Sequence, residues 1–179
     1  MANHEIVIAG FGGQGLLFAG KVLAYAALLE QRELSWLPSY GPEMRGGTAN
    51  CSVVLSDHPV GSPVFARCTE LIALNEPSLI KFEEGVLPGG TVFVNSDVVT
   101  DKVSRPDLTA YYIPCAKIAE EVGNPKVGNM VMLGAYVAAT KILKPETIEK
   151  MIETMFTGPK AKFIPLNIEA FRRGMACVQ

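Results

Sequence analysis

A glycine-rich turn directly after a short apolar strand is the feature that most constrains how this chain folds. Glu5–Ala9 predicts a buried strand, and Gly10-Phe11-Gly12-Gly13-Gln14-Gly15 follows it at once. This hexapeptide matches the pattern G-x-G-x-x-G and opens an expected helix from Gln14 to about Glu30, which is apolar on most sides and is therefore expected to be deeply buried. Glycines allow a tight turn and close approach of the backbone, and the free N–H groups of a helix N-terminus attract anions. The combination predicts an α/β domain with a binding crevice beside the glycine loop.

The rest of the chain alternates between strand-like and helix-like segments. Thr48–Ser56 alternates in polarity, which favours an antiparallel strand or one near a sheet edge. Further strands are expected at Leu34–Leu37 (ended by Pro38), Leu71–Leu74, Thr91–Asn95 and Tyr111–Ile113, and further helices at 77–84, 114–122, 129–143, 145–156 and 165–176. Leu87-Pro88-Gly89-Gly90 is expected to form a turn. With no linker or repeat, residues 1–179 are predicted to form a single three-layer α/β/α domain with a mixed, mainly parallel sheet and a Rossmann-like glycine loop.

Charge and hydropathy exclude several classes of partner. The chain has 16 basic and 18 acidic residues and a net charge of −2, so it lacks the positive excess that phosphate backbones select. Its longest nearly apolar run, Leu16–Leu29, is interrupted by Lys21 and is shorter than the ~20 residues that span a bilayer. The N-terminus has no basic segment of the secretory type. We therefore expect no nucleic-acid binding, no membrane span and a cytoplasmic location.

The cysteines and histidines of the chain do not indicate a metal site, and no set of catalytic residues is recognisable. Cys51, Cys68, Cys115 and Cys177 contain no C-x-x-C pair, and the chain has only two histidines. Clustered soft ligands for zinc or an iron–sulfur cluster are therefore not expected. No nucleophile is matched with a base, so no catalytic residue is assigned.

The glycine loop alone leaves three interpretations open. Dinucleotide-binding folds carry an acidic residue at the end of the second strand to hold the ribose hydroxyls. The expected second strand here ends near Pro38 without a carboxylate, since Glu30 and Glu33 precede it. Three interpretations of the loop are then left. It is either a tight corner that packs the helix on the sheet, or a binding site for another phosphate, or a contact for the backbone of a partner protein.

A second unusual segment lies between the second and third expected strands. Ser39–Thr48 places a tyrosine, a glutamate and an arginine between glycines, and Arg45 has the geometry to clamp a phosphate or carboxylate or to pair with Glu43. In an open α/β sheet this loop would lie near the glycine loop. Further along, Asn129 is most simply the N-cap of the helix that follows, with a polar contact to a ligand or partner as the alternative.

Together these segments resemble the gamma subunits of 2-oxoacid:ferredoxin oxidoreductases. The resemblance runs from about residue 4 to 140, with a similar stretch at 167–171. It is carried by the glycine loop after Ile6-Val7-Ile8, by Tyr40-Gly41-Pro42-Glu43-Met44-Arg45-Gly46-Gly47-Thr48, by Leu74-Asn75 and Gly89-Gly90-Thr91, and by Asn129-Met130-Val131-Met132-Leu133-Gly134-Ala135. Pro42 and Met44 look most like the 2-oxoglutarate branch, with the pyruvate and branched-chain types as close competitors.

The resemblance implies an accessory subunit of a larger enzyme. Such complexes decarboxylate a 2-oxoacid on thiamine diphosphate, pass electrons through iron–sulfur clusters to ferredoxin and transfer the acyl group to coenzyme A. Thiamine diphosphate and clusters would lie in alpha, beta and, as a further candidate, delta subunits, and this chain would bind no cofactor tightly. Self-association is a further expectation. Two alternatives stay open: the small subunit of indolepyruvate oxidoreductase, and a stand-alone dinucleotide-binding protein.

On this basis one functional face is expected, which either docks the partner subunits or borders the coenzyme A approach. It consists of Gly10, Gly12, Gly13, Gln14, Gly15, Tyr40, Gly41, Glu43, Arg45, Gly46, Gly47 and Asn129.

Overall fold

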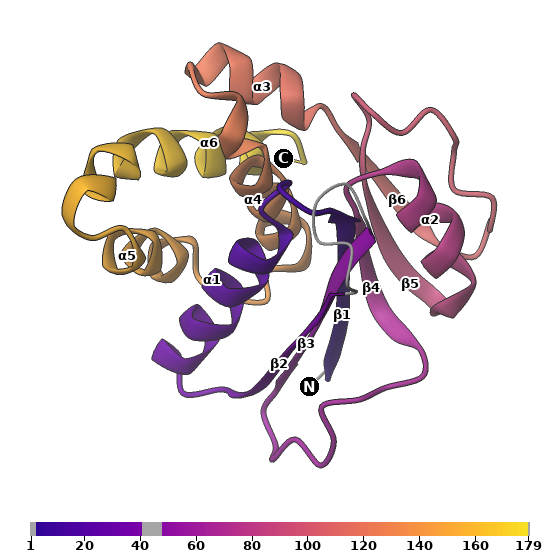
Figure 1. Cartoon of the computed structure of the whole chain (residues 1–179). Helices are drawn as coiled ribbons and strands as arrows, with labels where there is room; N and C mark the ends of the chain where they lie inside the picture. Colours follow the sequence, from indigo (N-terminus) through magenta and orange to yellow (C-terminus); the bar gives the residue numbers. More distant parts are fainter. Residues whose placement is uncertain (1–2, 41–47, 179) are drawn as a thin grey trace.

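Six strands form one mixed sheet in the order β2-β3-β1-β4-β5-β6 (Figure 1). The structure, a computed structural model, describes residues 3–40 and 48–178. The strands are β1 (His4–Phe11), β2 (Glu33–Tyr40), β3 (Thr48–Ser56), β4 (Cys68–Ala73), β5 (Val86–Asn95) and β6 (Thr109–Ile113). β1, β4, β5 and β6 are parallel neighbours, while β3 runs antiparallel to both β1 and β2. The predicted mixed, mainly parallel sheet is confirmed, as is the antiparallel strand at 48–56.

The helices cover the two faces of the sheet unequally. They are α1 (Leu16–Leu29), α2 (Glu76–Phe82), α3 (Cys115–Val122), α4 (Gly128–Thr140), α5 (Pro145–Met155) and α6 (Ile164–Ala176), with short 3-10 turns at Glu83–Gly85, Pro125–Val127 and Gly158–Phe163. One core joins the sheet to α1, α3, α4, α5 and α6, and a smaller core on the other face joins it to α2 (Figure 1). The three predicted layers are therefore present, with the second helical layer reduced to one short helix.

Side-chain alternation assigns each strand residue to one of these cores. Ile6 and Ile8 of β1 face the larger core, and Val7 and Ala9 face the smaller one. Both sets are buried because β1 lies in the middle of the sheet, between β3 and β4. The apolar run at the start of the chain thus forms the centre of the sheet.

Two sequence expectations about strand boundaries are wrong. β2 continues through Pro38 to Tyr40, because an outer strand needs hydrogen bonds on one side only and tolerates a proline there. The turn expected at 87–90 lies inside β5, where Cys68 pairs with Val86 but Glu70 pairs with Thr91. Gly89 and Gly90 lie within β5 at this shift of register, and Gly89 has a φ of 78°.

Helices α4 and α6 cross at a very short distance, and a glycine of each helix, Gly134 and Gly174, lies at the crossing point. A Cβ atom on Gly134 would overlap the carbonyl oxygen of Phe171, and one on Gly174 would overlap that of Val131. Only glycine allows two helix backbones to approach in this way. This contact braces α4, whose first turn reaches the glycine loop.

Candidate functional site

The glycine loop lies at the edge of the sheet where the parallel strands end. Gly10 is packed tightly, since a Cβ there would lie 2.9 Å from the Cβ of Leu74 at the end of β4. Gly12 and Gly13 form the turn itself, and Gly13 has a φ of 94°. Gly15, with a φ of 75°, is the N-cap of α1 and offers no side-chain cap to the first turn of that helix. The predicted strand, glycine turn and helix are confirmed, and the first-turn N–H groups of α1 keep their anion-attracting character.

Gln14 closes the crevice between the ends of β1 and β4. Its Oε1 accepts a hydrogen bond from the Phe11 amide at 2.6 Å, and its Nε2 donates to the Leu74 carbonyl at 3.0 Å. The order of strands along the chain reverses between β1 and β4, which is where open α/β sheets bind dinucleotides. The carboxamide of Gln14 therefore joins the ends of the two strands at this point.

Asn129 holds the glycine loop from the opposite side. Its Nδ2 donates to the Gly15 carbonyl at 3.1 Å, and its Oδ1 accepts from the Met130 amide at 2.9 Å. The expectation that Asn129 is a helix N-cap is wrong, because α4 begins at Gly128 with Val127 at the cap position. The side chain is buried against Gly15 and leaves no room for a Cβ on that residue.

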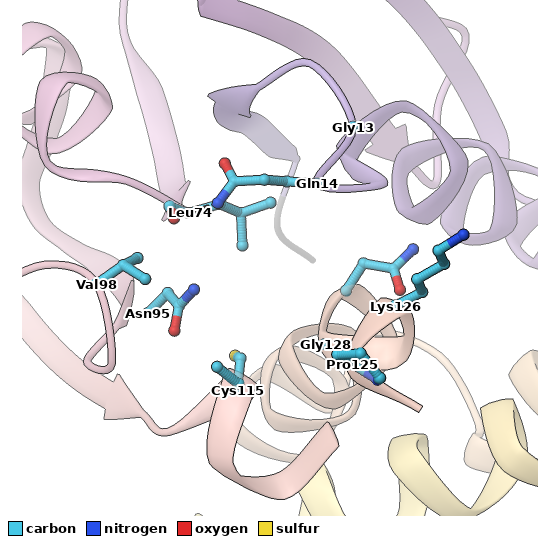
Figure 2. A pocket seen from close by; sticks show the side chains of 11 residues that line it. Gly13, Gln14, Leu74, Asn95, Val98, Cys115, Pro125, Lys126 and Gly128 are labelled. Atoms are coloured by element: carbon cyan, nitrogen blue, oxygen red, sulfur yellow. Dashed lines mark hydrogen bonds between the residues drawn. The ribbon is translucent and has the colours of Figure 1, made fainter. Parts of the chain in front are cut away.

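A cleft of about 270 Å³ opens beside the loop (Figure 2). Polar groups reach it from four parts of the fold: Gln14 after β1, Asn95 at the end of β5, Lys126 before α4, and Asn129. Asn95 is only 7% exposed, and its Oδ1 has no hydrogen-bond partner. A buried acceptor left free in this way costs stability unless something donates to it.

The electrostatics of the cleft favour binding over catalysis. Lys126 is the one charged side chain among the described residues that line it. Cys115 also lines the cleft, but burial raises the pKa of its thiol so far that it stays protonated. The described lining therefore presents amides, one cation and backbone N–H groups, and it contains neither a carboxylate base nor an activated nucleophile.

Sequence reasoning missed Asn95 and Lys126. Asn95 is the last residue of a correctly predicted strand, and a polar residue at the carboxyl end of a parallel strand is the signal that would have indicated it. Lys126 carries no comparable signal, because its place depends on how α3 and α4 are packed.

A second, apolar groove lies on the other side of the glycine loop. It has a volume of about 330 Å³ and is lined mainly by Phe11, Leu17, Phe18, Ala49 and the loop glycines. Its wall is formed by the start of α1 and the start of β3. The glycine loop thus separates a polar cleft from an apolar groove.

The second sequence-predicted segment falls mainly outside the described residues. Gly41, Glu43, Arg45, Gly46 and Gly47 lie there, and Tyr40 is described only as the last residue of β2. The two described ends of the segment do lie at the glycine loop, because Tyr40 pairs with Ala49, Ala49 with Gly10, and Thr48 with Phe11. The strands on either side of the second segment therefore end beside the glycine loop, and the joint face itself stays a prediction.

Within residues 3–40 and 48–178, no three histidine, cysteine or acidic side chains gather as metal ligands. Three of the four cysteines are buried in separate places, so these residues do not fit an iron–sulfur cluster. Over the same ranges, no helix has both the length and the apolar character needed to cross a bilayer.

Comparison with known proteins identifies what the fold and the loop are similar to. Residues 5–177 match the family model described as pyruvate ferredoxin/flavodoxin oxidoreductase. The 2-oxoglutarate synthase subunit KorC of Methanocaldococcus jannaschii is 40% identical over 176 residues, covering 96% of this chain and 92% of that protein. The ketoisovalerate oxidoreductase subunit VorA of Methanothermobacter thermautotrophicus is 41% identical over 171 residues, but the match covers only 35% of that protein.

A solved structure has the same fold over nearly the whole chain. The gamma subunit of a keto/oxoacid ferredoxin oxidoreductase from Geobacter sulfurreducens superposes with a TM-score of 0.87 at 33% identity, covering 99% of this chain and 97% of that one. This chain therefore spans nearly all of some relatives and about a third of others.

Proposed function

This chain belongs to the pyruvate ferredoxin/flavodoxin oxidoreductase family, and we propose that it is the gamma subunit of a 2-oxoacid:ferredoxin oxidoreductase of the 2-oxoglutarate type. The complex would convert 2-oxoglutarate and coenzyme A into succinyl-CoA and carbon dioxide while reducing ferredoxin, and it would work in the cytoplasm. The observation that carries this assignment is the match to KorC, which has nearly the same length as this chain.

The lining of the cleft supports an accessory role in that reaction. Its described residues hold no general base, nucleophile or metal ligand set. Decarboxylation and electron transfer would therefore take place on thiamine diphosphate and iron–sulfur clusters in alpha, beta and delta-type subunits. This chain would contribute to the assembly of the complex and to the approach of coenzyme A.

The glycine-loop face has a fixed conformation and can therefore bind one partner or ligand in a defined orientation. Gln14 and Asn129 fix the loop from two sides, and the cleft beside it offers the free Oδ1 of Asn95 and the ammonium group of Lys126. A cation next to helix N-termini favours an anionic group such as a phosphate. We place either a partner subunit or the entering coenzyme A on this face.

The assignment is tested by purifying the tagged chain from its own organism under anaerobic conditions. We expect thiamine- and cluster-bearing subunits to co-elute and to reduce a viologen dye only with 2-oxoglutarate and coenzyme A. A preference for arylpyruvates would instead favour the indolepyruvate enzyme. A partnerless, inactive eluate would contradict the proposal, and a titration with NADH would then test dinucleotide binding.

The role of the face is tested within that complex by Lys126→Ala and Asn95→Ala. If coenzyme A passes here, we expect the KM for coenzyme A to rise several-fold. Lys150→Ala on α5 is the matched control, since Lys150 is exposed and does not line the cleft. Arg45→Ala extends the test to the second loop. Unchanged assembly, KM and turnover in all of these variants would show that the face is wrongly assigned.

A further inference from the structure

One helix face in this fold carries more exposed apolar surface than its sequence predicts. Leu16–Leu29 contains a single charged residue, Lys21, and a helix that is apolar all round is normally buried on all sides. In the structure, however, Tyr25 is 42% exposed, Leu28 59% and Leu29 48%. The expected deep burial of α1 is therefore wrong for this face within the single chain.

These side chains lie on one side of α1. Leu17, Lys21, Tyr25 and Leu28 follow each other at spacings of four, four and three residues, so they form a row along the helix, and Leu29 flanks it. We call these five residues the α1 stripe. The opposite side of α1 packs on β2 and β3, and α5 lies beside it (Figure 1).

The α1 stripe continues into the apolar groove at the glycine loop. Leu17 belongs to both, and the groove adds Phe11 and Phe18 to the surface. The α1 stripe and the groove together extend over about 20 Å, the length of α1, and Lys21 is the one charged residue of the stripe. By contrast, the other large exposed apolar side chains lie singly on separate elements, as with Ile80 on α2 and Val64 in the loop before β4. Single exposed apolar residues are ordinary, but a contiguous strip marks an interface.

The relatives indicate which kind of molecule covers the α1 stripe. In VorA the matching part makes up 35% of a longer protein, whereas in KorC it makes up 92%. The same domain thus occurs both joined to about twice its own length of chain and as a separate subunit. A domain joined to its partner in one chain has a high effective concentration at the contact. A separate subunit must obtain its binding affinity from the interface alone. The affinity of such interfaces usually comes from a buried apolar centre.

We propose that the α1 stripe docks on the subunit equivalent to the remaining part of the joined relatives. This inference rests on the proposed function as a gamma subunit and adds the surface through which it assembles. The partner surface would be apolar, with one carboxylate opposite Lys21. That lysine is half-buried, and its Nζ lies 5.5 Å from the centre of the Tyr25 ring, so it is held in place to meet such a group.

The test uses the whole complex, produced by co-expressing this chain with its other subunits. Leu28→Glu places a charge at the most exposed apolar residue of the stripe and should lower the recovery of the partner subunit more than tenfold. Ile80→Glu is the matched control, because Ile80 is 65% exposed on the other face of the sheet, and recovery should stay within twofold of wild type. Circular dichroism and thermal unfolding of each isolated variant show that it is folded. Should Leu28→Glu unfold, Lys21→Glu replaces it, with the same loss expected.

The outcomes separate this inference from the proposed function. Normal recovery of partners with both stripe variants would overturn the inference while leaving the gamma-subunit assignment intact. A wild-type chain that recovers no partner would overturn the assignment itself. If the isolated wild-type chain is a dimer that Leu28→Glu converts into a monomer while partner recovery is unchanged, the stripe joins two copies of this chain and the inference is wrong.

Discussion

Asn129 donates its side-chain amide to the carbonyl of Gly15 across 114 residues of sequence. The bond joins the first turn of α4 to the N-cap of α1, so the two helices that border the candidate site are fixed to one another. Because the same amide group accepts from the Met130 N–H, its orientation is set from both ends. The glycine loop is therefore positioned by a distant helix as well as by its own glycines.

Gly15→Ala should lower the free energy of unfolding by about 2–3 kcal/mol. The left-handed backbone costs an alanine about 1 kcal/mol, and the new Cβ displaces the Asn129 side chain and its hydrogen bonds. Gly13→Ala meets open space and should cost only about 1 kcal/mol, while Gly61→Ala should be neutral. Urea unfolding of the three variants measures this ranking. Equal losses for Gly13→Ala and Gly15→Ala would refute the contact with Asn129.

Gln14→Ala should loosen the turn without unfolding the protein. It removes the acceptor of the Phe11 amide and the donor to Leu74, at a cost of about 1–2 kcal/mol. Hydrogen exchange followed by mass spectrometry should show faster exchange at residues 10–15. Glu153→Ala on the exposed side of α5 is the control and should leave this segment unchanged. Unaltered exchange in Gln14→Ala would show that the side chain does not hold the loop.

Among the glycines that the structure describes, Gly134 and Gly174 should be the most damaging to replace by alanine. Each methyl group would overlap a backbone carbonyl of the facing helix, and the helices can avoid this only by moving apart. We expect a loss of about 3 kcal/mol in the free energy of unfolding for each. Gly85→Ala, which has open space around the new Cβ, should change it by less than about 1 kcal/mol. A mild effect at both α4 and α6 would contradict the close crossing.

The stability of the fold should decrease above pH 9. Burial raises the pKa of the Cys51 thiol to about 12 and that of Cys68 to about 11, against 9.0 for an unperturbed thiol. The unfolded chain therefore releases these protons first, and the free energy of unfolding falls by about 1.4 kcal/mol per pH unit for each thiol. The loss should begin near pH 9 and extend to about pH 11 for Cys68. Urea unfolding at pH 8, 9, 10 and 11 measures the slope, which Cys51→Ala should make shallower. An identical slope in that variant would show that Cys51 does not titrate in this window.

The parts of the fold that sequence predicts well are those set by neighbouring residues. The first strand, the glycine turn and α1 follow from local spacing, and the alternation of Thr48–Ser56 correctly indicates an antiparallel strand. The helix expected at 77–84 is found as α2, which Asn75 caps with its side chain and which has a proline in its first turn. Each of these elements is decided by residues that are close to it in the sequence.

The parts that sequence does not predict depend on distant segments. Pro38 is compatible with a strand only because β2 has a neighbour on one side, which is a property of the whole sheet. Asparagine is a common helix-capping residue, so Asn129 was expected to cap its helix. Its actual hydrogen-bond partner, the Gly15 carbonyl, is near it only because α4 lies beside the glycine loop in the folded chain. Asn95 and Lys126 share a cleft because β5 and the turn before α4 end at the same edge. The sequence therefore indicated that the site lies at the glycine loop, but not which distant side chains line the cleft.

The glycine crossing of α4 and α6 also sets the order in which this site can form during synthesis. α4 carries the asparagine that holds the glycine loop, yet its most extensive helix contact, the one with α6, forms only after Phe171 and Gly174 have left the ribosome. The glycine turn itself is made within the first 15 residues. A nascent chain arrested before α6 would therefore display the turn without its final geometry, and other subunits would meet a finished binding face only on chains that have grown past it.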